Sequence, residues 1–525
     1  MGGQGLALTS GVAALFATCL LAATGWATSP APEPAGAQAV STAMPAPEDV
    51  VWYEVFVRSF QDSDGDGVGD LRGVTQRLDY LADLGIGGLW LMPIHPSPSY
   101  HGYDVTDYRD VNPEYGTVQD LVELLDAAHA RGLRVIIDFV PNHTSSSHPW
   151  FQAALAGDPW YRDFYVWSEE PPNWRGNYGG SAWHPAGGSH YLGLFSPAMP
   201  DLNHRNEDVV TEIMSVARFW LELGVDGFRV DAIQHVVESP DGVTANAPEN
   251  YVWVKRFQDF MSEVSPGALI VGETWTAMPA IARYHRESGL HMSFDYPIWR
   301  ELTEAIQRRS ASDLAFAIEQ ESALYPADAA RATFTGNHDQ TRLATQLSFP
   351  RRDERRIKLA ASLLLTLPGT PFLYYGEELG MPDGPGTSDV EKRTPMRWEP
   401  GAGLGFTSGV PWASPGEDST GVSVAEQTGD PGSVLEHYRT LIHVRNAYPA
   451  LNRGAAAVLE TGAPALLALE RSHGDEALYV LANLSARELE AAGVDLPAGS
   501  YRDLVTGAVF EGVVPALTVL VLQAD

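Results

Sequence analysis

The stretch VQDLVELLDAAHARGLRVIIDFV, residues 118–140, shows the unit from which the fold is built. Its first part, Val118–Arg131, predicts a helix, and Gly132 is the residue type that commonly follows a helix C-terminus. The second part, Arg134–Val140, is rich in Val, Ile and Phe, which is typical of a strand buried on both faces. A helix that leads straight into a buried strand is half of a βαβ unit.

Seven further runs of the same β type occur along the chain, with helical stretches between several of them. They are Val51–Val57, Gly88–Pro93, Gly227–Ala232, Ala268–Glu273, Met292–Tyr296, Ala332–Thr335 and Pro371–Tyr375. With Arg134–Val140 this makes eight buried strands that alternate with helices. The sequence therefore predicts an α/β fold, a (β/α)8 TIM barrel, over residues 49–142 and 206–447.

Two segments do not belong to the barrel repeat. Residues 143–205 lie between the third and fourth strands and predict an inserted subdomain, domain B, whose five tryptophans we expect mainly to form its own core. From residue 448 to 525 the pattern changes to short apolar runs separated by turns, such as Ala477–Asn483. This predicts a C-terminal antiparallel β-sandwich domain.

The N-terminus differs from the rest of the chain. Residues 6–22 form an uncharged apolar run followed by small residues, so residues 1–27 predict a secretory signal peptide. Residues 28–48, rich in Pro and Ala, predict a linker. We therefore expect a secreted protein without a membrane span. The only cysteine, Cys19, lies in the apolar run, and lipoprotein anchoring through it is the alternative.

The chain is strongly acidic, with 67 Asp and Glu against 34 Lys and Arg and a formal net charge of −33. Binding to nucleic acid or to an anionic membrane needs clustered cations, so this balance argues against both. A neutral or cationic ligand is compatible with such a surface.

Charged residues stand at the ends of four of the predicted buried strands. The third run contains Asp138 and is followed by His143, the fourth carries Arg229 and Asp231, the fifth ends at Glu273, and His338 and Asp339 follow the seventh. Active sites of such barrels form at the C-terminal ends of the strands. Burying several charges there is costly unless they are paired or functional, so we interpret this set as an active site.

These residue types fit retaining glycoside hydrolysis, which needs one nucleophilic carboxylate and one carboxyl that acts as acid and then as base. Asp231 lies two residues after Arg229 on one strand, so both side chains point the same way and we expect the cation to keep Asp231 ionised. Burial and nearby negative charge would raise the pKa of Glu273. His143 and His338 can donate hydrogen bonds to sugar hydroxyls.

Four motifs occur in order on these strands and resemble the signature regions of the α-amylase family, glycoside hydrolase family 13. They are DFVPNHTS (138–145), GFRVDAIQH (227–235), GETW (272–275) and FTGNHD (334–339). The resemblance implies that Asp231 is the nucleophile, Glu273 the acid/base and Asp339 the third essential carboxylate. It further implies that Arg229, His143 and His338 bind substrate, and that Tyr103, in the triplet His101–Tyr103, stacks on the sugar.

An acidic loop follows the first predicted strand. In DSDGDGVGD, residues 62–70, acids alternate with small residues, which is typical of an oxygen-rich calcium loop. We assign Asp62, Asp64, Asp66, Asp70 and the Val68 carbonyl to Ca²⁺, as in a similar loop in part of the family. Asn142 matches a second calcium position of the family, without recognisable further ligands.

Subgroup features point in two directions. MPDLN (199–203) and RTPMRW (393–398) resemble the side of the family that contains oligo-1,6-glucosidases. Ala232 follows the predicted nucleophile, where a Val often marks α-1,6 preference. Gln234 replaces the Lys found in many α-amylases. With predicted export, this favours an α-1,4-acting α-amylase on starch-type glucans and maltooligosaccharides. An exo-acting α-glucosidase or oligo-1,6-glucosidase and a transglycosylase remain alternatives, whereas a non-catalytic transporter-associated relative would have lost catalytic acids that this chain keeps.

Overall fold

The computed structural model describes residue 1 and residues 44–347, 353–416 and 420–525. Residues 44–525 form one compact unit. The predicted signal peptide and most of the predicted linker fall on residues 2–43, so they lie outside the described residues.

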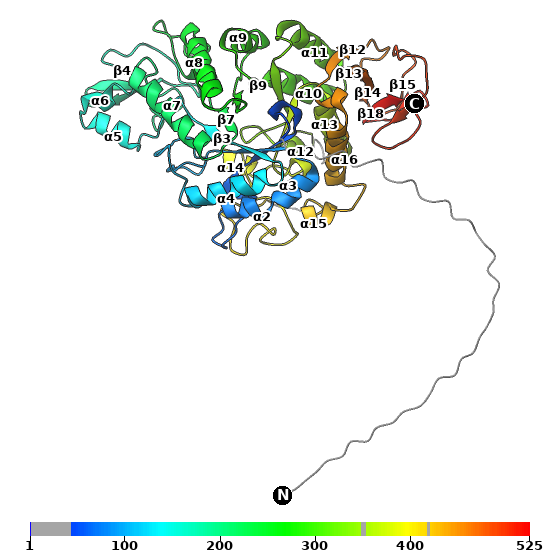
Figure 1. Ribbon diagram of the computed structural model, residues 1–525, viewed down its shortest axis with the longest axis horizontal. Helices are drawn as coiled ribbons and strands as arrows, with labels where there is room; N and C mark the ends of the chain where they lie inside the picture. Colours follow the sequence, from blue (N-terminus) through cyan, green and yellow to red (C-terminus); the bar gives the residue numbers. More distant parts are fainter. Residues whose placement is uncertain (2–43, 348–352, 417–419) are drawn as a thin grey trace, which may run out of the picture. The chain divides into compact units, whose positions relative to one another are not determined.

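Eight parallel strands close into a barrel in chain order, which confirms the predicted (β/α)8 fold (Figure 1). The strands are β1 (Trp52–Val55), β2 (Gly88–Leu91), β3 (Arg134–Phe139), β7 (Gly227–Val230), β8 (Leu269–Gly272), β9 (Met292–Phe294), β10 (Ala330–Phe334) and β11 (Thr370–Tyr374). The last strand pairs with the first, because Tyr53 lies opposite Leu373.

Most strands end one or two residues before the predicted runs do, and in two of them the reason is that a helix begins inside the run. β1 ends at Val55, and helix α1 (Val57–Phe60) begins two residues later. β9 ends at Phe294, and α10 (Tyr296–Arg308) starts almost at once, with the Asp295 side chain accepting the Ile298 N–H and a proline in the first turn. An N-cap acid followed by proline is a strong helix start.

The helix of the opening stretch forms as predicted and shows how the outer layer is held. α4 (Val118–His129) begins with a capping box between Thr117 and Asp120 and buries Leu121, Leu124, Leu125 and Ala128. Each buried leucine contributes roughly 1.5–3 kcal/mol. Gly132 follows in the left-handed region, with φ of 75°.

The other principal helices cover the barrel or its insert. They are α2 (Leu71–Gln76), α3 (Leu78–Leu84), α5 (Pro149–Leu155), α7 (Glu207–Glu222), α8 (Pro248–Val264), α9 (Met278–Ser288), α11 (Ser312–Leu324), α13 (Glu354–Thr366) and α16 (Val434–Ala447).

The insert contains a small antiparallel sheet, β4 (Trp167–Ser168), β6 (Ser189–Leu192) and β5 (Trp183–Ala186), beside α5 and α6 (Pro159–Arg162). Trp174 and Trp183 pack together with ring centroids 5.3 Å apart, and Trp167 stacks on Phe151. These tryptophans therefore form the insert's own core, as expected. Trp160 is the exception, because 54 % of its surface is exposed.

Beyond α16 the chain forms a five-stranded sheet and a two-stranded sheet. The larger has the order β12 (Ala455–Val458), β13 (Leu466–His473), β14 (Glu476–Asn483), β18 (Thr518–Ala524) and β16 (Tyr501–Asp503), and the smaller pairs β15 (Leu489–Glu490) with β17 (Val513–Val514). Alternate residues of β14 face two cores. Val480 packs in a cluster with Leu363 of the barrel helix α13, and Leu481 packs in a cluster with Val514 of the small sheet.

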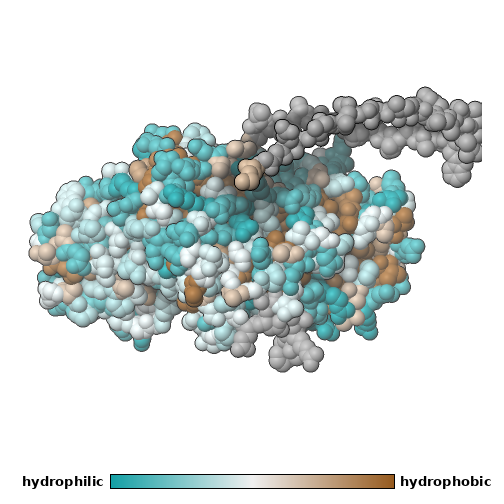
Figure 2. Space-filling model, turned by 90° about the horizontal axis from the view of Figure 1, so that it is seen from below, coloured by the Kyte–Doolittle hydropathy of each residue, from teal (hydrophilic) through white to brown (hydrophobic). Residues whose placement is uncertain are grey.

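The insert and the C-terminal sheets lie on opposite sides of the barrel (Figure 1). The face drawn in Figure 2 is mainly hydrophilic, with small scattered apolar patches, as suits an acidic exterior. Among the described residues, no helix is both long enough and apolar enough to cross a membrane.

Candidate active site

Three neighbouring strands bring the predicted acids together at the C-terminal edge of the barrel. Asp138 lies in β3, opposite Arg229 of β7, and Arg229 lies opposite Val271 of β8. Asp231 and Glu273 are the first residues after β7 and β8. Strand pairing alone therefore places these groups side by side.

The guanidinium of Arg229 joins three carboxylates. Its Nη1 donates to Asp138 Oδ1 at 2.8 Å and to Asp231 Oδ1 at 2.7 Å, and its Nη2 lies 2.6 Å from Glu273 Oε1. Arg229 is 1 % exposed. The guanidinium is rigid and planar, and its two Nη atoms bind Asp231 and Glu273. It therefore fixes the separation and orientation of these two carboxylates.

A backbone turn after the nucleophile candidate aims the second acid. Ala232 has φ of 46°, a left-handed conformation that is uncommon for a residue other than glycine. In this conformation its N–H donates to Glu273 Oε2 at 2.9 Å. Both oxygens of Glu273 are thereby held, one by Arg229 and one by the turn.

Burial raises the pKa of both central acids to about 7, against the opposing effect of Arg229. Burial likewise raises the pKa of Asp138 to about 6. Arg229 lies beside Asp231 as expected, but burial raises the pKa of Asp231 more than Arg229 lowers it. The Asp231–Glu273 pair instead shares protons near neutral pH, as coupled acids do.

Asp339 stands apart from this buried cluster, with 47 % of its side chain exposed at the mouth of the barrel. Arg393 Nη2 donates to its Oδ1 at 2.8 Å, and the Lys392 ammonium donates to its backbone carbonyl. Although burial opposes ionisation, the cations Arg393, Arg229 and Lys392 lower the pKa of Asp339. This carboxylate is therefore charged near neutral pH.

His338 is completely buried, and both ring nitrogens contact protein groups. Nδ1 lies 2.5 Å from Glu54 Oε1, and Nε2 lies 2.7 Å from the Tyr103 hydroxyl. Burial raises the pKa of Glu54 well above its usual value and lowers the pKa of His338 to about 3. The pair is thus held neutral, and it positions Tyr103, whose ring stacks on His338 at 5.5 Å.

His143 is also buried, and its Nε2 lies 3.2 Å from the Tyr103 carbonyl. Burial lowers the pKa of His143 to about 4, so the imidazole is neutral. The structure therefore groups Tyr103, His143, Arg229 and His338 around the acids. Asn142, the residue of the possible second calcium position, interacts with the buried Asp201, whose Oδ2 has no hydrogen-bond partner among the described residues.

The acidic loop gathers three of its four predicted acids. Carboxylate oxygens of Asp62, Asp64 and Asp70 all lie within 4.8 Å of one another. An all-carboxylate set of hard oxygen donors suits Ca²⁺. Asp66 lies outside this group, and its carboxylate accepts the Val68 N–H at 2.7 Å.

The loop is clamped between Asp62 and a later segment of the chain. Asp62 accepts the N–H groups of Gly65 and Gly67, and it also accepts the hydroxyl of Thr407. Gly67 has φ of 97°, and an added Cβ there would lie 2.0 Å from the Val410 carbonyl. A metal at this loop would therefore tie the start of the barrel to residues 406–412.

Sequence reasoning did not single out several residues that complete the site. Glu54, Tyr296 and Arg393 contact the residues described above, and Tyr296 places its hydroxyl 3.3 Å from Glu273 Oε1. Glu54 was visible as a single charge inside an apolar strand. Arg393 follows no strand of the barrel and gave no such signal.

Residues 54–454 match the family described as alpha amylase, catalytic domain. The chain is 39 % identical to alpha-amylase 3 of Dictyoglomus thermophilum over 84 % of this chain and 86 % of that protein. It is 35 % identical to trehalose synthase of Pimelobacter sp. over 83 % of this chain and 86 % of that protein.

A solved structure, the alpha-amylase from H. orenii, superposes with a TM-score of 0.81 at 36 % identity and covers 91 % of this chain and 100 % of that chain. The similarity thus spans the barrel, the insert and the C-terminal sheets together. This chain belongs to the α-amylase family, glycoside hydrolase family 13, whose members are retaining glycoside hydrolases.

Proposed function

We propose that this enzyme is a secreted α-amylase that hydrolyses α-1,4-glucosidic bonds of starch-type glucans and maltooligosaccharides with retention of configuration. The observation that supports this reaction is that the guanidinium of Arg229 holds Asp231 and Glu273 side by side on its two Nη atoms. The apolar run at residues 6–22 supports export. A mature N-terminus near residue 28, read by mass spectrometry, would support it further, whereas an intact N-terminus would count against it.

In the first step Asp231 attacks the anomeric carbon and forms a covalent glycosyl ester, while Glu273 gives its proton to the departing glycosidic oxygen. Glu273 is suited to this because its raised pKa of about 7 keeps it protonated at mildly acidic pH. When the pair holds a single proton, Arg229 is the counter-charge for the ionised carboxylate, and the reaction uses the form in which Asp231 is ionised and Glu273 is protonated.

In the second step Glu273, now ionised, takes a proton from an incoming water, which attacks the anomeric carbon and releases Asp231. The Ala232 N–H holds Glu273 in the same orientation for both steps. Interception of the ester by a sugar hydroxyl instead of water would give transglycosylation.

Asp339 supplies the third carboxylate, charged and exposed at the mouth, where it can accept hydrogen bonds from sugar hydroxyls. Tyr103 offers a ring fixed by His338 for stacking on the sugar at the cleavage point. Since His143 and His338 contact Tyr103 in the structure, their hydrogen bonds to sugar would form only as substrate binds.

Internal cleavage of α-1,4 bonds is supported by the similarity to two proteins named alpha-amylase. A time course on maltoheptaose tests it. We expect early maltose, maltotriose and maltotetraose together. Glucose with maltohexaose alone would replace the proposal by an exo-acting α-glucosidase, and products longer than the substrate would indicate a transglycosylase, as the trehalose synthase relative suggests.

We propose that Ca²⁺ binds Asp62, Asp64 and Asp70, with the Val68 carbonyl, and acts by stabilising the fold. Loss of a ligand held about 100-fold above its Kd costs about 2.7 kcal/mol, so excess chelator should lower the Tm of a unit of this size by about 3 °C. Asp64→Asn should make the Tm insensitive to chelator. Asp66→Asn is the matched control and should keep that sensitivity, because Asp66 lies outside the cluster. An unchanged Tm after complete removal of metal would contradict the calcium site.

A further inference from the structure

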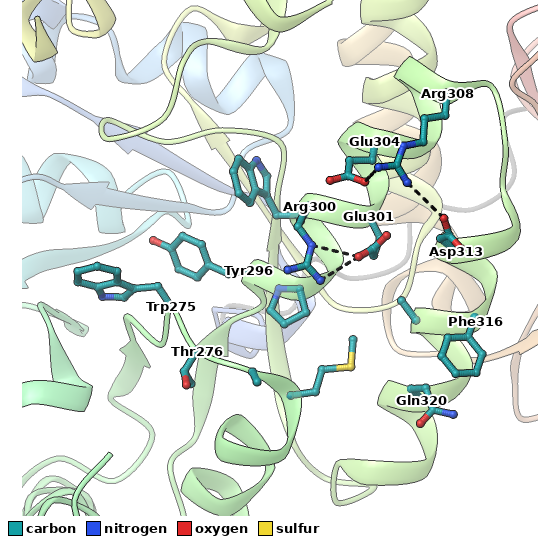
Figure 3. Close-up of a pocket in the computed structure, with 15 residues that line it drawn as sticks. Trp275, Thr276, Tyr296, Arg300, Glu301, Glu304, Arg308, Asp313, Phe316 and Gln320 are labelled. Carbon is teal, nitrogen blue, oxygen red and sulfur yellow. Dashed lines mark hydrogen bonds and ion pairs between the residues drawn. The ribbon is translucent and has the colours of Figure 1, made fainter. Parts of the chain in front are cut away.

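An open cavity of about 750 Å³ lies next to the proposed acid/base and is not formed by the four sequence motifs alone. Its walls come from the segment after β8 and from helices α10 and α11. Figure 3 shows Trp275 and Tyr296 at one end and Phe316 and Gln320 at the other. Cavities of this size commonly hold small-molecule ligands.

The cavity begins on the leaving-group side of the cleavage point. Trp275 lies two residues after Glu273, and the hydroxyl of Tyr296 lies 3.3 Å from Glu273 Oε1. A general acid protonates the leaving oxygen, so the part of the substrate that departs lies on its side. Trp299 makes the floor rigid, because its indole N–H donates to the Thr335 carbonyl and its ring stacks on Phe334.

The walls are polar, and both of their cations are paired with acids. Arg300 pairs with Glu301 at 2.9 Å, and Arg308 pairs with Glu304 at 2.7 Å and with Asp313 at 3.5 Å (Figure 3). Paired charges beside exposed rings suit a neutral ligand that has both hydroxyl groups and flat apolar faces. A chain of glucose units has this chemistry.

Phe316 links this cavity to a second one. It is 60 % exposed on α11 and lines both the first cavity and a space of about 420 Å³ between α11 and the C-terminal sheet, which Glu460, Thr461 and Gly462 also line. A large apolar side chain exposed between two adjoining cavities is well placed to support an extended ligand.

We propose that these two cavities form one glucan-binding path, called here the α11 groove and defined by Trp275, Tyr296, Trp299, Phe316 and Thr461. It binds the leaving-group end of a long α-glucan, and Phe316 stacks on a glucose unit several positions from the bond that is cleaved. The groove rests on the proposed function, because its occupant is the substrate of that site.

The first test compares kcat/KM on maltoheptaose with kcat/KM on maltotriose, which under this proposal does not extend to Phe316. We expect Phe316→Ala to lower the ratio of the two values about fivefold, the effect of losing one aromatic contact. Trp160→Ala, which removes a similarly exposed ring from the insert, should keep the wild-type ratio. A ratio in Phe316→Ala equal to that of the wild type would overturn the proposal. A change in the oligomeric state of this variant, measured by light scattering, would also overturn it, because the surface would then be a contact with a second copy of the chain.

Binding without turnover separates the groove from the proposed function. Calorimetry with maltoheptaose on Asp231→Asn should give a measurable Kd, and adding Phe316→Ala should weaken it about fivefold. Equal affinities of the single and double variants would overturn the groove alone. Failure of Asp231→Asn to bind any glucan, together with an inactive wild type, would instead overturn the proposed function.

Discussion

Asp231→Asn should lower kcat on maltoheptaose by at least about 10⁴-fold, because an amide cannot form the glycosyl ester and the direct attack of water is not otherwise activated. The substitution is nearly isosteric, and Asn can still accept the hydrogen bond from Arg229. It also removes a buried carboxylate whose pKa is raised to about 7 by burial, so the folded state should not lose stability. Steady-state rates, with the Tm of the same preparation, measure both effects.

The matched control lies at the opposite end of the same strand. Asp226 precedes β7, pairs with His129 at 2.8 Å and accepts the Val135 N–H, so Asp226→Asn removes structural contacts far from the proposed chemistry. It should lower the Tm and keep kcat. Residual activity of Asp231→Asn above about 1 % of wild type, in a preparation free of contaminating hydrolase, would contradict the assignment of the nucleophile.

The barrel could be predicted because its strands are buried on both faces, so each one appears in the sequence as a short apolar run. Errors occurred where this signal overlaps the next helix, as at Val57 and Tyr296. Phe, Tyr and Val are compatible with both states, and only the capping contacts of Asp295 and its neighbours decide where the strand ends. The short strands β15, β16 and β17 carry too few residues for any pattern.

The candidate site was predictable wherever a charge follows or interrupts a buried strand. Asp231 and Glu273 were found in this way, and Glu54 could have been, since a lone acid in β1 needs a partner such as His338. Arg393 could not be found by this reasoning, because it reaches Asp339 from a loop more than fifty residues away in the chain. Its role depends on tertiary packing alone.

The ionisation states of the acids could not be predicted from sequence patterns either. Sequence spacing places Arg229 beside Asp231, but it does not show that Asp138 and Glu273 use the same guanidinium. Sharing one cation among three buried carboxylates weakens its effect on each. Burial raises the pKa values of Asp231 and Glu273 more than the shared Arg229 lowers them, and the motif alone does not show this burial.

Glu273→Gln should lower kcat on maltoheptaose by about 10³-fold, because neither the leaving oxygen nor the incoming water then has a proton partner. A dinitrophenyl α-glucoside, whose leaving group needs no proton, should still form the glycosyl ester, so a burst of dinitrophenolate should precede a slow steady state. Azide, which needs no general base, should speed that second step and yield a glycosyl azide. Equal losses on both substrates would contradict the acid/base role.

The pH dependence separates Glu273 from other buried acids. Since Asp231 and Glu273 titrate as a coupled pair around pH 7, wild-type kcat/KM should be bell-shaped: it falls on the alkaline side as the pair loses its last proton, which Glu273 must donate, and on the acidic side as a second proton neutralises Asp231. On the dinitrophenyl α-glucoside, whose leaving group needs no proton, the alkaline limb should be absent from both the wild type and Glu273→Gln, and the acidic limb should remain in both. Glu321 is the matched control, since burial raises its pKa to about 8 and it pairs with Arg331 away from the site. Glu321→Gln should leave the alkaline limb of kcat/KM in place. If the limb disappears in this variant, its cause is general unfolding and not proton donation by Glu273.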